Sequence, residues 1–225
     1  MSNTDSFDRL AARDAPVTDF EVRYGRNGPT DRQLRLIGDV TRKRTLDLGT
    51  GSGQAAVAFA KHGATSIAID TSSERVADAR RLAERADAKV EWHTGDLAEL
   101  AFLRADSIDV VFSAYALGEI EDLGRLFRQV HRVLHPAGLF VFSFEHPVAT
   151  ALRAQRSAFD DTPLAIERDG RRTALYLHPI ESVVTALGRA GFRVDAIVEP
   201  EPPSTALERA KLPTTIVWRA RKEGV

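Results

Sequence analysis

The sequence predicts an α/β fold in which a doubly wound, mainly parallel sheet carries helices on both faces. One indication is a glycine-rich loop that joins a strand ending at Leu48 to a helix beginning at Gln54. Another is that short apolar runs alternate with helical segments as far as residue 145 and again after residue 178. Strands that alternate with helices in this way pair in parallel through right-handed crossovers. The 225 residues suit one core of ordinary size.

Composition narrows the classes of partner that the chain can have. The formal net charge is −1 and 43% of the residues are hydrophobic, so no bulk electrostatic attraction draws the chain to nucleic acid or to an anionic membrane. The absence of cysteine excludes disulfides, thiolate metal sites and a cysteine nucleophile. No apolar run is long enough to span a membrane, and the N-terminus lacks the features of a signal peptide. We therefore expect a cytoplasmic protein.

The glycine loop places Gly49, Gly51 and Gly53 at alternate positions between the strand and the helix. Glycine adopts positive φ and lets a ligand approach the backbone, and the helix N-terminus beyond offers unpaired N–H groups. This pattern predicts a nucleotide site. The dinucleotide fingerprint needs its third glycine where Gln54 stands, so the spacing disfavours NAD. A tight turn without a ligand is the alternative, which we disfavour because three such glycines cost entropy without improving packing.

The remaining elements follow in order. Residues 1–43 form an expected helical cap or lid segment, with helices near Phe7–Arg13 and Asp31–Asp39, the second capped by Thr30. Residues 44–225 form the nucleotide-binding domain. Its later strands are expected at Ser66–Asp70, Lys89–His93, Ile108–Ser113, Leu139–Glu145, Val194–Val198 and Thr214–Ala220. Its later helices are expected from a capping box at residues 71–74 to about Arg85, at about Leu123–Leu134 and at Pro179–Ala190.

Residues 146–178 interrupt the alternation of strands and helices. They are polar and rich in arginine, and the segment Arg168–Arg171 is able to turn a small hairpin. An irregular insertion of this length is more often functional than incidental. We expect this insertion, together with the N-terminal segment, to form a lid over an acceptor site. Its arginines suit an anionic acceptor, although a solvated charged face explains any single arginine slightly better.

Several motifs accompany the glycine loop at the ends of the expected strands. They are Leu46–Gly53, Asp70 after the second strand, Gly95–Leu97 after the third, Val133–Leu139 before the fifth, and Ala190–Phe192 leading to Glu199 and Pro200. With these motifs the chain resembles, over roughly its whole length, the class I S-adenosylmethionine (SAM) dependent methyltransferases. The resemblance is closest to the small-molecule "type 11" group. It implies a Rossmann-like, seven-stranded sheet whose last strand is antiparallel, and SAM as cofactor with S-adenosylhomocysteine as product.

The resemblance also implies roles for single residues. Asp70 is expected to bind the ribose hydroxyls and Asp96 the adenine amino group, while Tyr24 is similar to an N-terminal aromatic that closes over SAM. Asp70 as a helix N-terminal charge and Asp96 as a turn residue remain the alternatives. The residues expected to contact the cofactor are Tyr24, Asp47, Gly49, Thr50, Gly51, Gly53, Asp70, Thr71, Asp96, Leu97 and Ser113.

Catalytic groups are less well specified. His146 lies just past the fifth strand and its side chain suits a base near neutral pH, but a loop histidine satisfied by backbone groups is an equal alternative. Glu119 is a second candidate; Glu145, Tyr115 and His178 are further ones. A histidine that the family often carries after strand four is replaced here by residues 116–119. No Asn/Asp-Pro-Pro-Tyr follows that strand, which argues against amino-group methylation of nucleic acid. The histidines show no metal-ligand spacing, so no metal is expected.

We therefore expect a SAM-dependent methyltransferase that acts on a small-molecule acceptor, without nucleic acid or membrane partners, as a monomer or homodimer. Whether the acceptor atom is oxygen, nitrogen or carbon is left open by the sequence. Two alternatives remain: an NAD-dependent oxidoreductase on the same fold, and a SAM-binding protein without turnover.

Overall fold

A computed structural model describes residues 20–25, 28–168, 171–201 and 212–224. Its main element is a seven-stranded sheet in the order β3-β2-β1-β4-β5-β9-β8. Neighbouring strands from β3 to β5 are parallel, and β9 runs antiparallel to both β5 and β8. The expected sheet with an antiparallel last strand is therefore confirmed. The strands are β1 (Arg44–Leu48), β2 (Thr65–Asp70), β3 (Val90–Thr94), β4 (Ile108–Ala114), β5 (Leu134–Glu145), β8 (Phe192–Val198) and β9 (Thr215–Lys222), with a separate hairpin of β6 (Leu164–Arg168) and β7 (Arg171–Leu175).

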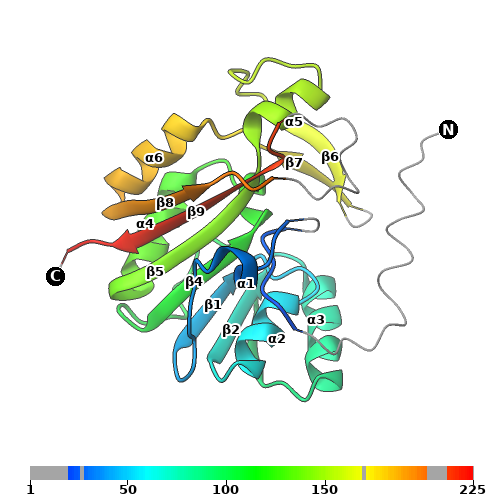
Figure 1. Ribbon diagram of the computed structural model, residues 1–225. Coiled ribbons are helices and arrows are strands. Elements are labelled where there is room, and N and C mark those ends of the chain that lie inside the picture. Colours follow the sequence, from blue (N-terminus) through cyan, green and yellow to red (C-terminus); the bar gives the residue numbers. More distant parts are fainter. Residues whose placement is uncertain (1–19, 26–27, 169–170, 202–211, 225) are drawn as a thin grey trace.

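Helices cover both faces of this sheet (Figure 1). One face packs against α4 and α6, and the other against α2 and the N-terminal segment. The helices end where the sequence predicts they should, within one or two residues, except in the segments treated below. Their bounds are α1 (Asp31–Leu34), α2 (Gln54–Lys61), α3 (Ser73–Arg85), α4 (Leu123–Val133), α5 (Pro147–Arg153) and α6 (Ile180–Arg189), with a 3₁₀ turn, η1, at Ala116–Glu119.

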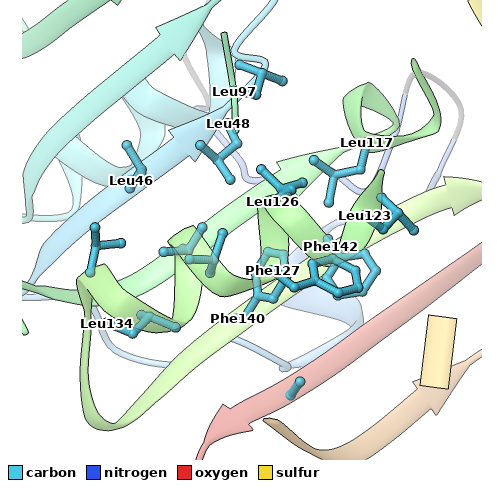
Figure 2. Packing of buried hydrophobic residues seen from close by; sticks show 14 of the residues in the cluster. Leu46, Leu48, Leu97, Leu117, Leu123, Leu126, Phe127, Leu134, Phe140 and Phe142 are labelled. Carbon is cyan, nitrogen blue, oxygen red and sulfur yellow. The ribbon is translucent and has the colours of Figure 1, made fainter. Parts of the chain in front are cut away.

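The larger core lies between α4 and the sheet. Figure 2 shows Leu126 and Phe127 of α4 beside Phe140 and Phe142 of β5. Each of these side chains is fully buried, and burial of one such side chain contributes about 1.5–3 kcal/mol. The apolar positions repeat at helical spacing on α4 and at alternate residues on β5, so the two elements meet along one continuous face. This packing fixes the strand ends that carry the site.

The N-terminal segment turns earlier than expected. The helix predicted at Asp31–Asp39 is wrong in length, because α1 has only one turn and ends at Arg35 with φ +54°. The Asp31 carboxylate explains this: its Oδ1 accepts hydrogen bonds from the N–H groups of Leu36 and Ile37 at 2.9 and 3.0 Å. It also accepts the Tyr24 hydroxyl at 2.5 Å. These bonds replace further helical turns. The helix predicted near residues 7–13 lies outside the described residues.

The insertion after β5 is more ordered than the sequence indicated. It contains a helix, α5, that was not predicted, and then the β6–β7 hairpin, which confirms the expected turn. Both lie at the carboxyl end of the sheet (top of Figure 1). Two bonds attach the hairpin region to η1: Tyr176 N–H donates to the Gly118 carbonyl at 2.8 Å, and Thr173 Oγ1 donates to Glu119 Oε2 at 3.0 Å.

Ala137 lies in the turn before the main part of β5. In the structure this residue has φ +60°, a left-handed conformation that costs a residue with a Cβ about 1–2 kcal/mol. The strand β5 also begins earlier than expected, since Leu134 already pairs with Ile108.

Candidate functional site

The glycine loop lies at the carboxyl ends of β1 and β2, where Gly49 N–H donates to the Ile69 carbonyl at 2.8 Å. All three glycines have positive φ, but their surroundings differ. A Cβ on Gly49 would overlap that of Ala116, and a Cβ on Gly53 would lie 2.6 Å from that of Ala79. A Cβ on Gly51 would meet nothing within 4 Å. Two glycines therefore do improve packing, contrary to the sequence argument, and only Gly51 leaves its approach open.

Asp47, on β1, is buried beneath this loop. Its Oδ2 accepts the Thr50 hydroxyl at 2.7 Å. Burial, aided by the nearby Asp70 carboxylate, raises the pKa of Asp47 to about 7 against the opposite effect of the hydrogen bonds from Thr50 and from the Ala56 N–H. Asp47, which is 2% exposed, thus bonds both to the loop and to the first turn of α2.

Asp70 is the last residue of β2, and its carboxylate bonds the glycine loop. Its two carboxylate oxygens accept N–H bonds from Gly51 at 3.0 Å and from Ser72 at 2.9 Å. The Arg75 guanidinium lies 3.9 Å away. A carboxylate offers about four lone-pair positions, so two remain for a ligand. The side chain is only 2% exposed, so a ribose hydroxyl reaches it only if the loop around Gly51 shifts.

The expected adenine residues follow β3. Asp96 is 44% exposed in its side chain; its Oδ1 accepts the Ala98 N–H at 2.8 Å, and its Oδ2 lies 3.4 Å from Arg125 Nη1. Leu97 is buried in the larger core, whereas Thr71, just past β2, is exposed. Asp96 therefore has an open carboxylate edge at the position expected for a hydrogen bond to adenine.

Two expected cofactor residues use their hydroxyls inside the protein. Ser113 is fully buried and donates to the Leu48 carbonyl at 2.7 Å, which bonds β4 to β1 near their carboxyl ends. Tyr24 is also fully buried, packs against Phe112 and donates to Asp31. Burial and the Asp31 carboxylate raise the pKa of Tyr24 above its ordinary value. Cofactor contacts from both residues remain predictions.

Tyr115 connects the N-terminal segment to the strand ends. It follows β4 with φ +63°, a conformation that a bulky residue adopts only where its surroundings demand it. Its N–H donates to the Ser143 carbonyl at 3.0 Å. Its ring occupies the position that a Cβ on Gly25 would need, and its hydroxyl bonds Thr215 Oγ1 at the start of β9. The segment around Gly25 thus lies over the carboxyl end of β4 and the first residue of β9.

His146 lies one residue past β5, at the same edge. The side chain is 7% exposed, and its Nε2 is 2.8 Å from Glu199 Oε1. Its backbone N–H donates to the Thr214 carbonyl at 2.9 Å. The other ring nitrogen, Nδ1, is buried with no hydrogen-bond partner among the described residues. The ring is therefore held by a carboxylate on one side and leaves one nitrogen for a further contact.

The other candidate bases are engaged differently. Glu119 accepts a hydrogen bond from Thr173 in the hairpin. His178 Nε2 donates to the Ile120 carbonyl at 2.8 Å, and burial lowers the pKa of this histidine. Glu145 Oε2 lies 4.0 Å from an arginine of α5. Among these candidates within the described residues, His146 is the histidine with a carboxylate partner and an unpaired ring nitrogen.

The sequence analysis missed Asp31 and Glu199 as organising residues. Asp31 follows Thr30 and looks like an ordinary first-turn acid. Glu199 stands in a proline-rich loop 53 residues from His146, and only the antiparallel pairing of β5, β9 and β8 brings the two together. No local pattern in the sequence encodes such a contact.

Within the described ranges, no three His, Asp or Glu side chains gather into a group that could hold a metal ion. Nor does any helix in these ranges have the length and apolarity to cross a membrane.

Several known proteins resemble this chain in sequence. Residues 46–142 match the family model described as a methyltransferase domain. A magnesium-protoporphyrin O-methyltransferase from Rhodobacter capsulatus is 31% identical over 141 residues, 61% of this chain and 62% of that protein. A ubiquinone biosynthesis O-methyltransferase from Azorhizobium caulinodans is 24% identical over 80% of this chain and 69% of that one. The chain spans less than two thirds of the Rhodobacter relative and 45% of a yeast relative.

Solved structures resemble this chain over most of its length. An S-adenosylmethionine dependent methyltransferase from Mesorhizobium loti superposes with a TM-score of 0.69 at 28% identity, covering 85% of this chain and 96% of that one. A candidate S-adenosylmethionine dependent methyltransferase from Listeria monocytogenes gives a TM-score of 0.74 at 24% identity, covering 86% and 97%. The second likeness, at this identity, concerns the fold alone.

Proposed function

We propose that this chain, which belongs to the class I SAM-dependent methyltransferases of the type 11 group, transfers a methyl group from SAM to a proton-bearing oxygen of a small-molecule acceptor. The single observation that carries the donor assignment is the pairing of Gly51 with Asp70. The open glycine and the acidic strand end meet at 3.0 Å, beyond the carboxyl ends of β1 and β2, where open α/β sheets bind ligands.

The residues of the site fit the donor. The Gly51 backbone is open, and Asp96 has an exposed carboxylate edge for the adenine amino group. Asp70 retains lone pairs for two ribose hydroxyls, which reach it when the loop around Gly51 shifts. The eight-residue helix α2 begins directly after the loop, and its N-terminal dipole favours negative charge such as a carboxylate. SAM, when bound, would supply a methyl group: its carbon–sulfur bond would break, with both electrons remaining on sulfur, as the acceptor oxygen bonds to the methyl carbon.

The protein's own contribution is to hold the acceptor and to remove its proton. In such a reaction the enzyme mainly orients the reactants and excludes water. The N-terminal segment over Tyr115 and the hairpin bonded to Glu119 border the carboxyl edge of the sheet, which suits them to cover an acceptor. His146 stands at that edge with one nitrogen unpaired. The assignment to oxygen is supported by the two relatives, which are a magnesium-protoporphyrin O-methyltransferase and a ubiquinone biosynthesis O-methyltransferase.

An acceptor screen tests the proposal. The protein is incubated with tritium-labelled SAM and a panel of phenols, catechols and carboxylic acids, and label in each acceptor is counted after separation. We expect transfer to at least one member, and transfer at least tenfold lower with His146→Asn because a general base contributes about 10²–10⁴-fold. Binding of S-adenosylhomocysteine is measured beside it by calorimetry. A protein that binds neither SAM nor S-adenosylhomocysteine would refute the proposed function.

A further inference from the structure

We propose that Glu199 is a positioning residue for His146: it holds Nε2 as the protonated nitrogen, so that Nδ1, which is buried in the protein alone, keeps a free lone pair and receives the acceptor's proton once the residues that cover it move. This rests on the proposed function and deepens it. The two side chains come from distant loops, one after β5 and one after β8, and meet at 2.8 Å. No motif in the sequence joins them.

The burial of the pair indicates which nitrogen carries the proton. A buried polar atom without a partner costs about 1–3 kcal/mol, so the unpaired Nδ1 of His146 needs an explanation. If Nδ1 carried a proton, a buried N–H donor would be left unsatisfied while Nε2 would face the Glu199 carboxylate lone pair to lone pair. The reverse arrangement lets Nε2–H donate to Glu199, and the atom left over is then an acceptor. Only this tautomer satisfies the carboxylate contact.

The proton balance follows from this tautomer. The O–H bond of the acceptor breaks, an Nδ1–H bond forms, and the electron pair of the O–H bond remains on the oxygen that is methylated. The imidazolium that results carries protons on both nitrogens. The Glu199 carboxylate opposite Nε2 stabilises that positive charge, as the orienting acid does in other acid–histidine pairs. The Glu199 side chain is 46% exposed, so this carboxylate is in contact with water beside the histidine when the proton is released.

Nitrogen-15 NMR on the full-length protein, labelled at histidine and bound to S-adenosylhomocysteine, tests the tautomer directly. The His146→Asn variant assigns the signals of His146. We expect neutral His146 to carry its proton on Nε2 in the wild-type protein. Glu199→Ala should lose this preference, Glu199→Asp should restore it in part, and Glu199→Gln should keep it, because the amide oxygen still accepts. Glu201→Ala, an exposed neighbour in the same loop, is the matched control and should leave the spectrum unchanged.

Single-turnover rates, measured with the phenols and carboxylic acids of the panel, connect the tautomer to the reaction. We expect Glu199→Ala to slow transfer at least tenfold, and Glu199→Gln to slow it although the tautomer is kept, since the charge is lost. S-adenosylhomocysteine should bind all variants within twofold of wild type. A proton on Nδ1 of neutral His146, an unchanged spectrum in Glu199→Ala, or equal rates would overturn the inference. So would a wild-type protein that binds S-adenosylhomocysteine yet methylates no member of the panel, whereas loss of that binding counts against the proposed function instead.

Discussion

At the residue scale, the three glycines of the loop differ in what surrounds them. Gly49 and Gly53 make room for Ala116 and Ala79, while Gly51 borders open space. We predict that Gly49→Ala lowers the free energy of unfolding by more than the left-handed backbone alone costs, because the new methyl group overlaps a neighbour. Gly51→Ala should lower the free energy of unfolding by about 1–2 kcal/mol, from its φ alone. For each kcal/mol of stability lost, Gly51→Ala should weaken SAM binding more than Gly49→Ala does.

Urea unfolding and calorimetry on both variants separate the two effects. Equal stability losses would show that the overlap at Gly49 is relieved by a cheap shift of η1. Unchanged SAM affinity in a folded Gly51→Ala protein would show that the donor does not approach this glycine.

Asp47 makes stability depend on pH. Its pKa rises from the ordinary value of 3.8 in an unfolded chain to about 7 in the folded protein, so between these two values the folded state holds a proton that the unfolded state has lost. Stability therefore falls as the pH rises from about 4 to about 7 and is level above that. The effect is on the order of 4 kcal/mol.

The Asp47→Asn variant isolates this contribution, because the amide oxygen still accepts the Thr50 hydroxyl. The difference in unfolding free energy between the variant and wild type should grow in favour of the variant from pH 4 to pH 7. Parallel pH profiles would mean that Asp47 ionises as readily when folded as when unfolded.

Asp70 and Asp96 should contribute unequally to donor binding. Asp70 has lone pairs for two ribose hydroxyls and also holds Gly51, whereas Asp96 offers one bond from a half-exposed side chain. At about 1.5–3 kcal/mol for each hydrogen bond to a charged group, we expect Asp70→Asn to weaken SAM binding more than Asp96→Asn. Titration calorimetry on the two matched variants decides. If Asp96→Asn weakened SAM binding more than Asp70→Asn, with both proteins folded, the assignment of Asp70 to the ribose and of Asp96 to adenine would be wrong.

At the scale of elements, local patterns predicted what local interactions determine. The helix α3 begins within one residue of the expected capping box, although Ser72 rather than Thr71 caps it by accepting the Arg75 N–H. The helix α4 ends at Val133 before the proline turn. The local patterns failed where a distant or unusual contact determines the bounds of an element. The side chain of Asp31 stops α1 after one turn, and α5 begins at Pro147, a signal for a first helical turn that the polar character of the insertion obscured.

The lid remains a prediction at this scale. The β6–β7 hairpin is a two-stranded sheet attached to η1 by Thr173 and Tyr176, and an isolated pair of strands has little stability of its own. We expect amides at 164–168 and 171–175 to exchange with deuterium faster than those of β4, and to become protected when S-adenosylhomocysteine and an acceptor from the panel are bound. Exchange as slow as that of β4 in the protein alone would make the hairpin part of the rigid core.

At the scale of the whole molecule, the sheet explains why so much of the site could be located from sequence. Gly49, Asp70 and Asp96 each follow a strand, and parallel strands bring their carboxyl ends to one edge. The antiparallel β9 breaks this simple rule. It inserts between β5 and β8 and so places Glu199 beside His146, a juxtaposition that depends on three strands at once. Strand ends were therefore predictable and the contacts across β9 were not.

The central claim is that this fold binds SAM rather than a dinucleotide. Thermal unfolding in the presence of SAM, S-adenosylhomocysteine or NAD tests it most directly. Ligand at about one hundred times its Kd should add ~2.7 kcal/mol, which for a chain of this size raises Tm by roughly 5–10 °C. We predict that rise with SAM and with S-adenosylhomocysteine, and none with NAD. A rise with NAD and no response to SAM would contradict the account.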